Sequence, residues 1–130
     1  MIHIYYRTGD TSSTKALQWF KEHDIAIKKH KLSEIPYTAI FQALLLSGQG
    51  IEGLVKYKTR IKAEHLSSLQ KLYNLSLKEG LYYLTKNSEL LHSPIILDQD
   101  KVLIGYHVED IRQFLPTEYR KLERLIRLHT

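Results

Sequence analysis

Hydrophobic positions along the first part of the chain predict two short strands with a helix between them. Residues 1–6 (M-I-H-I-Y-Y) alternate in character and are rich in β-branched and aromatic side chains, which is typical of a strand. Ala16 and Phe20 lie on one face of a predicted helix that continues to about His23. Residues 25–27 (I-A-I) predict the second strand. Together these elements form a βαβ unit, in which the strands run parallel with a right-handed crossover.

The middle of the chain predicts helices. One opens at residues 33–36 and ends at 47–50, one covers 65–72, and one runs from Ser76 towards Asn87. The first ends at S-G-Q-G because glycine readily takes the left-handed conformation found after a helix. The last begins with a capping box, in which Ser76 and Glu79 satisfy each other's backbone groups. Residues 51–60 are left as a connector.

The pattern near the C-terminus predicts a hairpin followed by helices. Residues 94–97 (P-I-I-L) are typical of a buried strand, and 102–104 (V-L-I) of its antiparallel partner across a polar turn. A helix is expected at 107–115, where Pro116 stops it. In the tail, residues 117–130, apolar side chains recur at helical spacing. We expect this tail to fold back on the domain, or else to contact a partner or a second copy.

These elements predict an α/β fold with a βαβ half, a ββα half and a mixed four-stranded sheet. We expect one domain over residues 1–116, with a helical insertion at about 33–88 and an amphipathic helical tail at 117–130.

Composition is that of a soluble globular domain, with 43% hydrophobic and 25% charged residues. No apolar run approaches the roughly 20 residues that cross a bilayer, and the N-terminus lacks the pattern of a secretory signal. We therefore expect a cytoplasmic protein that does not contact membranes. The chain has no cysteine, which excludes disulfides, thiolate metal sites and cysteine nucleophiles within it.

Basic residues exceed acidic residues by 19 to 14, a net charge of +5. They are scattered, apart from residues 28–31 and the tail, so the simplest interpretation is a basic, soluble surface. A weak contact with DNA phosphates is the alternative. The seven histidines show no spacing typical of a zinc site. We predict no metal and no cofactor.

The polar loop T-G-D-T-S-S-T-K, residues 8–15, lies between the first strand and the first helix. Asp10 is suited to cap that helix by accepting bonds from its first N–H groups. Anion binding at the helix N-terminus, assisted by Lys15, is the alternative. A serine nucleophile at Ser13 would need a positioned base, and His3 is the only histidine close to it in sequence.

Several motifs in residues 1–116 resemble the Spx/arsenate reductase (ArsC) family. The most specific is G-Y-x-x-x-D-I-R-x-F-L-P at 105–116. Shorter matches are T-S-S-T-K-A after the first strand, T-R at 59–60, L-Y-x-L-x-x-N at 81–87 and L-L-x-x-P-I-I-L at 90–97. Chain length and the F-L-P ending are more similar to the Spx proteins than to the enzymes.

The resemblance implies a thioredoxin-like fold and a regulator that binds the C-terminal domain of the RNA polymerase α subunit. Many Spx proteins carry a C-x-x-C redox switch after the first strand, and the arsenate reductases carry one catalytic cysteine there. The matching positions here are Asp10 and Ser13, so the resemblance implies a degenerate redox loop. Pro94 matches the family's structural proline beside that loop, which is commonly cis.

Arg60 matches one of the arginines that hold the oxyanion in arsenate reductases. However, Ser93 stands before the proline, where the family usually has another arginine. An ordinary ion pair is the alternative interpretation of Arg60.

The resemblance also implies that a glycine in the helical insertion lies against the polymerase domain. Gly50 is the best match and Gly53 the second, in the sequence Gly50-Ile51-Glu52-Gly53. A helix C-cap is the alternative for Gly50.

Three functions follow as hypotheses. The first is a transcription regulator that binds the C-terminal domain of the polymerase α subunit without a thiol switch. The second is a degenerate arsenate reductase-like protein, although we expect no enzymatic activity without a thiol. The third is a module that binds a different protein. The oligomeric state stays open.

Overall fold

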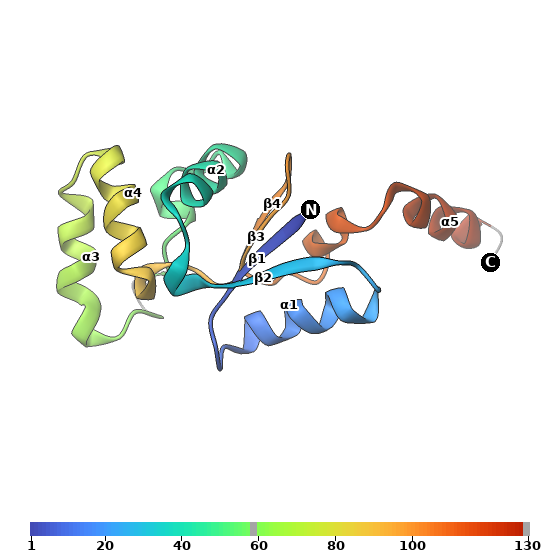
Figure 1. The fold of residues 1–130 in the computed structure, drawn as a ribbon, viewed down its shortest axis with the longest axis horizontal. Helices are drawn as coiled ribbons and strands as arrows, with labels where there is room; N and C mark the ends of the chain where they lie inside the picture. Colours follow the sequence, from blue (N-terminus) through green and yellow to red (C-terminus); the bar gives the residue numbers. More distant parts are fainter. Residues whose placement is uncertain (58–59, 129–130) are drawn as a thin grey trace.

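A mixed four-stranded sheet lies at the centre of the protein in the computed structural model, which describes residues 1–57 and 60–128 (Figure 1). The strands are β1 (Ile2–Tyr6), β2 (Ile27–Lys31), β3 (Ile95–Leu97) and β4 (Val102–Ile104), in the order β2-β1-β3-β4. β1 pairs with β2 in parallel and with β3 antiparallel, and β3 pairs with β4 antiparallel. The predicted α/β fold with a mixed four-stranded sheet is confirmed.

Among the described residues, four helices cover the two faces of this sheet: α1 (Thr11–Glu22), α2 (Tyr37–Ser47), α3 (Leu66–Tyr73) and α4 (Leu77–Lys86). A fifth helix, α5 (Thr117–Leu128), follows at the C-terminal end. Figure 1 shows α1 on one side of the sheet and α2 to α4 on the other. Accordingly, the buried side chains form two clusters. One joins α1 to Ile4 and Ile96, and the other joins α2, α3 and α4 to Tyr5 and Ile95.

The second strand begins later than the sequence pattern predicted. The apolar residues 25–27 lead into β2, whose own sequence is I-K-K-H-K. β2 is an edge strand that pairs only with β1, and Lys28, Lys29 and Lys31 are exposed. Edge strands commonly carry lysine, which discourages pairing with other chains. The hydrophobic pattern therefore finds only the first residue of this strand and misplaces its extent.

The helix predicted at residues 107–115 is wrong in extent and type. The chain forms a 3-10 helix over Asp110–Phe114, with Ile111 and Phe114 buried. These two apolar residues are three apart, which matches the three residues per turn of a 3-10 helix. Leu115 and then Pro116 follow this helix, and the proline prevents a longer helix from forming.

The tail helix α5 extends away from the domain instead of folding back along it (Figure 1). None of its described residues is buried. Two contacts tie the helix to the domain, an ion pair between Arg112 and Glu123 and an edge contact between the rings of Tyr119 and His23. The expectation that the tail packs on the domain is wrong for the rest of its length, because Leu115 has an extended backbone that leads the chain outwards. Residues 129–130 lie outside the described part.

Within residues 1–57 and 60–128, the helices are too short and too polar for any of them to cross a bilayer.

Candidate functional site

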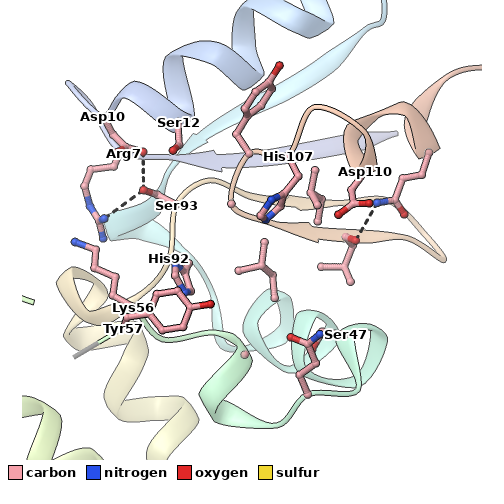
Figure 2. A pocket seen from close by; sticks show the side chains of 18 of the residues that line it. Arg7, Asp10, Ser12, Ser47, Lys56, Tyr57, His92, Ser93, His107 and Asp110 are labelled. Atoms are coloured by element: carbon pink, nitrogen blue, oxygen red, sulfur yellow. Dashed lines mark hydrogen bonds between the residues drawn. The ribbon is translucent and has the colours of Figure 1, made fainter. Parts of the chain in front are cut away.

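An open groove brings together the loop after β1 and the connector after α2, two segments that sequence analysis singled out separately (Figure 2). Its volume of about 1460 Å³ exceeds the roughly 300–1,000 Å³ of a typical small-molecule pocket. One wall is the loop at residues 7–12, and the other contains Gln49, Glu52, Gly53, Lys56, Tyr57 and Arg60. His92 and Ser93 form the floor between them. The size and open shape of the groove fit a macromolecular partner better than a small ligand.

Asp10 caps helix α1. Its Oδ2 atom accepts hydrogen bonds from the backbone N–H of Ser13 at 3.1 Å, from the Ser13 hydroxyl at 2.9 Å and from the Ser93 hydroxyl at 2.6 Å. Ser13 is only 1% exposed, and its oxygen also accepts the backbone N–H of Arg7 at 3.1 Å. The Ser13 hydroxyl is therefore buried and engaged in the cap, where it is not placed to act as a nucleophile.

Arg7 is the residue of this site that sequence analysis missed. Its guanidinium donates to the carbonyl of Ser88 at 2.7 Å, to that of Leu91 at 3.2 Å and to the Ser93 hydroxyl at 3.3 Å. The side chain thus ties the loop after β1 to the segment before β3 (Figure 2). An arginine directly after a strand was the only signal in the sequence, and its partners lie more than eighty residues further along the chain.

Burial and neighbouring charges shift the pKa values of Asp10 and Lys56 in this groove. Burial raises the pKa of Asp10, but hydrogen bonds from Ser93 and Ser13 and the charge of Arg7 outweigh it, so the pKa lies below its ordinary value. Lys56 across the groove has a lowered pKa, mainly because of burial and then because of Arg7. Asp10 is therefore ionised at neutral pH and sits among cations. A second anion in the loop would meet this carboxylate, which disfavours the anion-binding alternative.

His92 lies at the floor of the groove, half-buried, with its ring edge against Tyr57. Burial lowers its pKa below the ordinary value of 6.5, and Arg60, Lys56, His107 and Arg7 lower it further. A proton on His92 is therefore disfavoured in the folded protein, because it would be poorly hydrated and surrounded by positive charges.

We expect the free energy of unfolding to fall as the pH drops below 6.5, the ordinary pKa of His92. The unfolded chain binds a proton there before the folded chain does, so the stabilisation is complete above that pH and is lost through the interval down to the lower folded pKa. Urea unfolding at about pH 7.5 and about pH 5.5 measures this loss. His92→Gln should reduce it. His65→Gln is the control, since His65 contacts Glu64, and an unchanged loss in His92→Gln would contradict the prediction.

The connector Gly50-Ile51-Glu52-Gly53 is a short helical turn anchored to the core by Ile51. Gly50 has φ +69°, and Ile51–Gly53 form a 3-10 helix behind it. Ile51 packs inwards against the core and faces Gly80, where any added Cβ would lie 2.9 Å from the Ile51 side chain. Glu52 is exposed. The connector is thus anchored by Ile51 and presents Glu52 and Gly53 to the groove.

The sequence S-G-Q-G at the end of α2 contains two glycines, and only one of them caps the helix. The C-cap of α2 is Gly48, with φ +64°, whose N–H bonds to the Leu44 carbonyl. Interpreting Gly50 as that cap is therefore wrong. A Cβ added to Gly50 would have no atom within 4 Å, so this glycine lies against open space.

Arg60 lines the groove on the connector side. Of the ion pairs among the described residues, none includes Arg60, so the ordinary ion pair considered for it is not found there. Thr59, the other half of the T-R motif, lies outside the described residues, as does Lys58. The peptide bond between Ser93 and Pro94 is cis, and the Ser93 hydroxyl donates to Asp10 in the loop after β1.

Known proteins are similar to this chain in both sequence and fold. The ArsC family model matches residues 5–114. The chain is 35% identical over 127 residues to the global transcriptional regulator Spx of Lactiplantibacillus plantarum, covering 96% of this chain and 94% of that protein. It is 30% identical over 125 residues to Spx of Streptococcus agalactiae, covering 95% and 89%.

The solved structure of a possible arsenate reductase from Streptococcus mutans superposes with a TM-score of 0.67 at 19% identity, covering 93% of this chain and 98% of that one. This likeness concerns the fold alone, which is the thioredoxin-like arrangement of the ArsC proteins. A family match over most of the domain, together with the Spx relatives, shows that this chain belongs to the ArsC family.

Proposed function

We propose that this protein is an Spx-like transcription regulator that binds the C-terminal domain of the RNA polymerase α subunit. The observation that carries the proposal is the identity of 30–35% with proteins named global transcriptional regulator Spx, over nearly the whole chain. The docking surface is the connector Gly50-Ile51-Glu52-Gly53 together with Arg60 and the groove beside it. A weak contact between basic side chains and DNA phosphates accompanies this docking.

The geometry of the groove supports a protein partner. Its walls carry both signs of charge, with Asp10 and Glu52 close to Arg7, Lys56 and Arg60. A protein surface of mixed charge can complement such an arrangement, whereas a polyanion would be repelled by the carboxylates. Activity is set without a thiol in this chain, because the chain has no cysteine. In this proposal, abundance, proteolysis or a different signal takes the place of the redox signal.

Isothermal titration of the full chain with the purified C-terminal domain of the α subunit tests the proposal directly. We expect saturable binding with one domain per chain. The absence of binding at high micromolar concentration, with a protein shown to be folded, would contradict it. Recovery of a different protein on co-purification from the native host would instead support the third hypothesis, a module that binds another partner.

We expect no reduction of arsenate by this protein. Reduction by this family begins with attack by a thiolate, and the chain has no thiol. In addition, the two matching positions hold Asp10 and Ser13, and the Ser13 hydroxyl is buried and bonded to Asp10. Incubation with arsenate, glutathione and glutaredoxin should give product at the rate of the buffer alone. Turnover in proportion to protein concentration would show that the second hypothesis is correct.

A further inference from the structure

Two histidine rings from neighbouring strands face each other. The Nδ1 atom of His3 on β1 lies 2.9 Å from the Nε2 atom of His30 on β2. The ring planes are close to parallel, at 16°, and the ring centres are 5.1 Å apart. The two nitrogens are therefore nearer to each other than the ring centres are, and their separation is that of a hydrogen bond. One nitrogen carries the hydrogen and the other accepts it.

The pair lies beside a small open pocket between the sheet and α2. Its volume is about 170 Å³, and His3 and Tyr5 line it together with neutral side chains of α2. A water molecule takes up about 30 Å³ in the liquid, so the pocket has room for the His3 ring to move. Tyr5 is the strand neighbour of His30, and the two rings stack with their centres 4.9 Å apart. His30 is therefore held by a stacked ring, whereas His3 has space to turn away.

A proton fits between these nitrogens better than a metal ion does. Zn–N bonds are about 2.0–2.1 Å long, so two histidine nitrogens on one tetrahedral zinc ion are about 3.3 Å apart or more. The nitrogens of His3 and His30 are closer than that, at 2.9 Å. In addition, no three histidine or carboxylate side chains within residues 1–57 and 60–128 are grouped to hold a metal ion. The geometry of the pair is thus that of a hydrogen bond.

The surroundings of His3 disfavour a charge on its ring. Burial lowers its pKa below the ordinary value of 6.5. The positive neighbours that lower it further are His30, Lys28 and the amino group of Met1, whereas Asp98 in the β3–β4 turn raises it. α2 adds no charge, because the side chains that it brings to the pocket are neutral. Burial also raises the pKa of Tyr5, so the ring stacked on His30 is uncharged. A second positive charge beside His30 is therefore disfavoured.

We propose that His3 and His30 form a pH-sensitive switch on β1 and β2, which is closed while at most one of the two rings is charged and open when both are. A neutral ring carries a hydrogen on one of its two nitrogens, and a charged ring carries a hydrogen on both. As long as one ring is neutral, its bare nitrogen can accept the bond from the other ring. When both rings are charged, no acceptor remains and two positive charges face each other. The His3 ring then turns into the pocket.

The switch acts at the edge of the sheet, away from the proposed docking surface. β2 pairs only with β1, so opening the histidine pair loosens this edge strand first. Because the pKa of His3 is lowered by folding, the closed form is favoured above 6.5 and is lost as the pH falls through the folded pKa. Neither histidine lines the groove, so the switch does not depend on the proposed function. A chain without cysteine has no thiol to respond with, and acid is the signal to which this pair responds.

Nitrogen NMR of the full, isotope-labelled chain tests the switch without any substitution. We expect a scalar coupling across the hydrogen bond from Nδ1 of His3 to Nε2 of His30 at about pH 7.5 and its loss at about pH 5, the interval in which histidine changes charge. Over the same interval, the amides that join β1 and β2 should lose protection from hydrogen exchange by at least about threefold relative to those that join β3 and β4. A missing coupling at about pH 7.5, or one that persists once both rings are charged, would overturn the proposal.

Substitution of His30 provides a second readout. His30→Gln keeps a polar side chain that cannot become charged, so the proton affinity of His3 should rise at least about threefold. The pKa of His3 should still lie below 6.5 in this variant, because burial remains. His65→Gln is the control, since His65 contacts Glu64, and it should leave the titration of His3 unchanged. Circular dichroism confirms that each variant is folded. Equal proton affinities of His3 in the wild type and in His30→Gln would show that the two charges do not oppose each other, and the switch would be refuted.

Discussion

Replacing Gly50 with arginine should abolish detectable binding to the C-terminal domain of the polymerase α subunit, with a loss of at least about thirtyfold in affinity. This glycine has open space around the position of a Cβ, and the proposed function places the partner there. A long, charged side chain would hold the two surfaces apart. Calorimetric titration of wild type and variant under the same conditions measures the difference.

The matched control is Gly50→Ala at the same position. Both substitutions place a side chain on a backbone with φ +69° and ψ −171°, a region that essentially only glycine occupies, which costs roughly 1–3 kcal/mol of stability in either case. The two variants differ in the length and charge of the added side chain, so Gly50→Ala should bind within about threefold of wild type if that long, charged side chain is what blocks docking. Gly53 is unsuited to this experiment, because a Cβ there would lie 2.7 Å from the Cβ of Gln49 and would deform the connector.

The contrary outcomes have distinct meanings. If Gly50→Arg binds as tightly as wild type while wild type binds well, the docking surface lies elsewhere and only the assignment of the connector fails. If both Gly50 variants lose binding equally, the backbone conformation of the connector matters instead of the space in front of it.

Replacing Asp10 with alanine should lower the free energy of unfolding by about 2–3 kcal/mol, from the lost helix cap and the lost charge-assisted hydrogen bonds. One carboxylate oxygen accepts from the backbone and side chain of Ser13 and from the Ser93 hydroxyl. Without it, the Ser13 hydroxyl loses its acceptor while remaining buried, and Arg7 loses a neighbouring negative charge. Urea denaturation of the variant measures the effect.

Two comparisons separate the cap from the charge. Asp10→Asn keeps an oxygen acceptor that can cap the helix, so it should cost about half as much as Asp10→Ala. Asp100→Ala removes an exposed carboxylate in the β3–β4 turn and should change the stability by no more than about 0.5 kcal/mol. A loss in Asp10→Ala no greater than that in Asp100→Ala would mean that the network is not stabilising.

The low pKa of Asp10 adds a dependence on pH. A carboxyl group with a depressed folded pKa stabilises the protein above its ordinary value of 3.8 and loses that contribution as the pH falls through the folded pKa. The difference in stability between wild type and Asp10→Asn should therefore shrink in acid. A difference that grew in acid would contradict the assignment of charge at Asp10.

Local sequence determined the elements whose signals lie within a few residues of one another. The alternation in residues 1–6 specifies β1, and Asp10 ahead of Ala16 and Phe20 specifies the start and buried face of α1. The capping box of Ser76 and Glu79 forms as the sequence predicted. Helix caps and amphipathic faces depend on residues that are close together along the chain. They can therefore be predicted from the sequence without knowledge of the tertiary structure. The absence of cysteine also decided, from sequence alone, that thiol chemistry is unavailable.

Only the tertiary structure decided which distant residues meet. Arg7 bonds to Ser88, Leu91 and Ser93, which no local pattern connects to it. The loop after β1 and the connector after α2 form one groove because the sheet and α2 bring them together. β2 was misplaced because an edge strand needs few apolar residues, and the exposed apolar side chains of α2 appeared in the sequence like those of any buried helix. The exposure of a side chain, its hydrogen-bond partners and the shape of the groove all depend on packing between segments that are far apart in the chain. No local sequence pattern reports that packing.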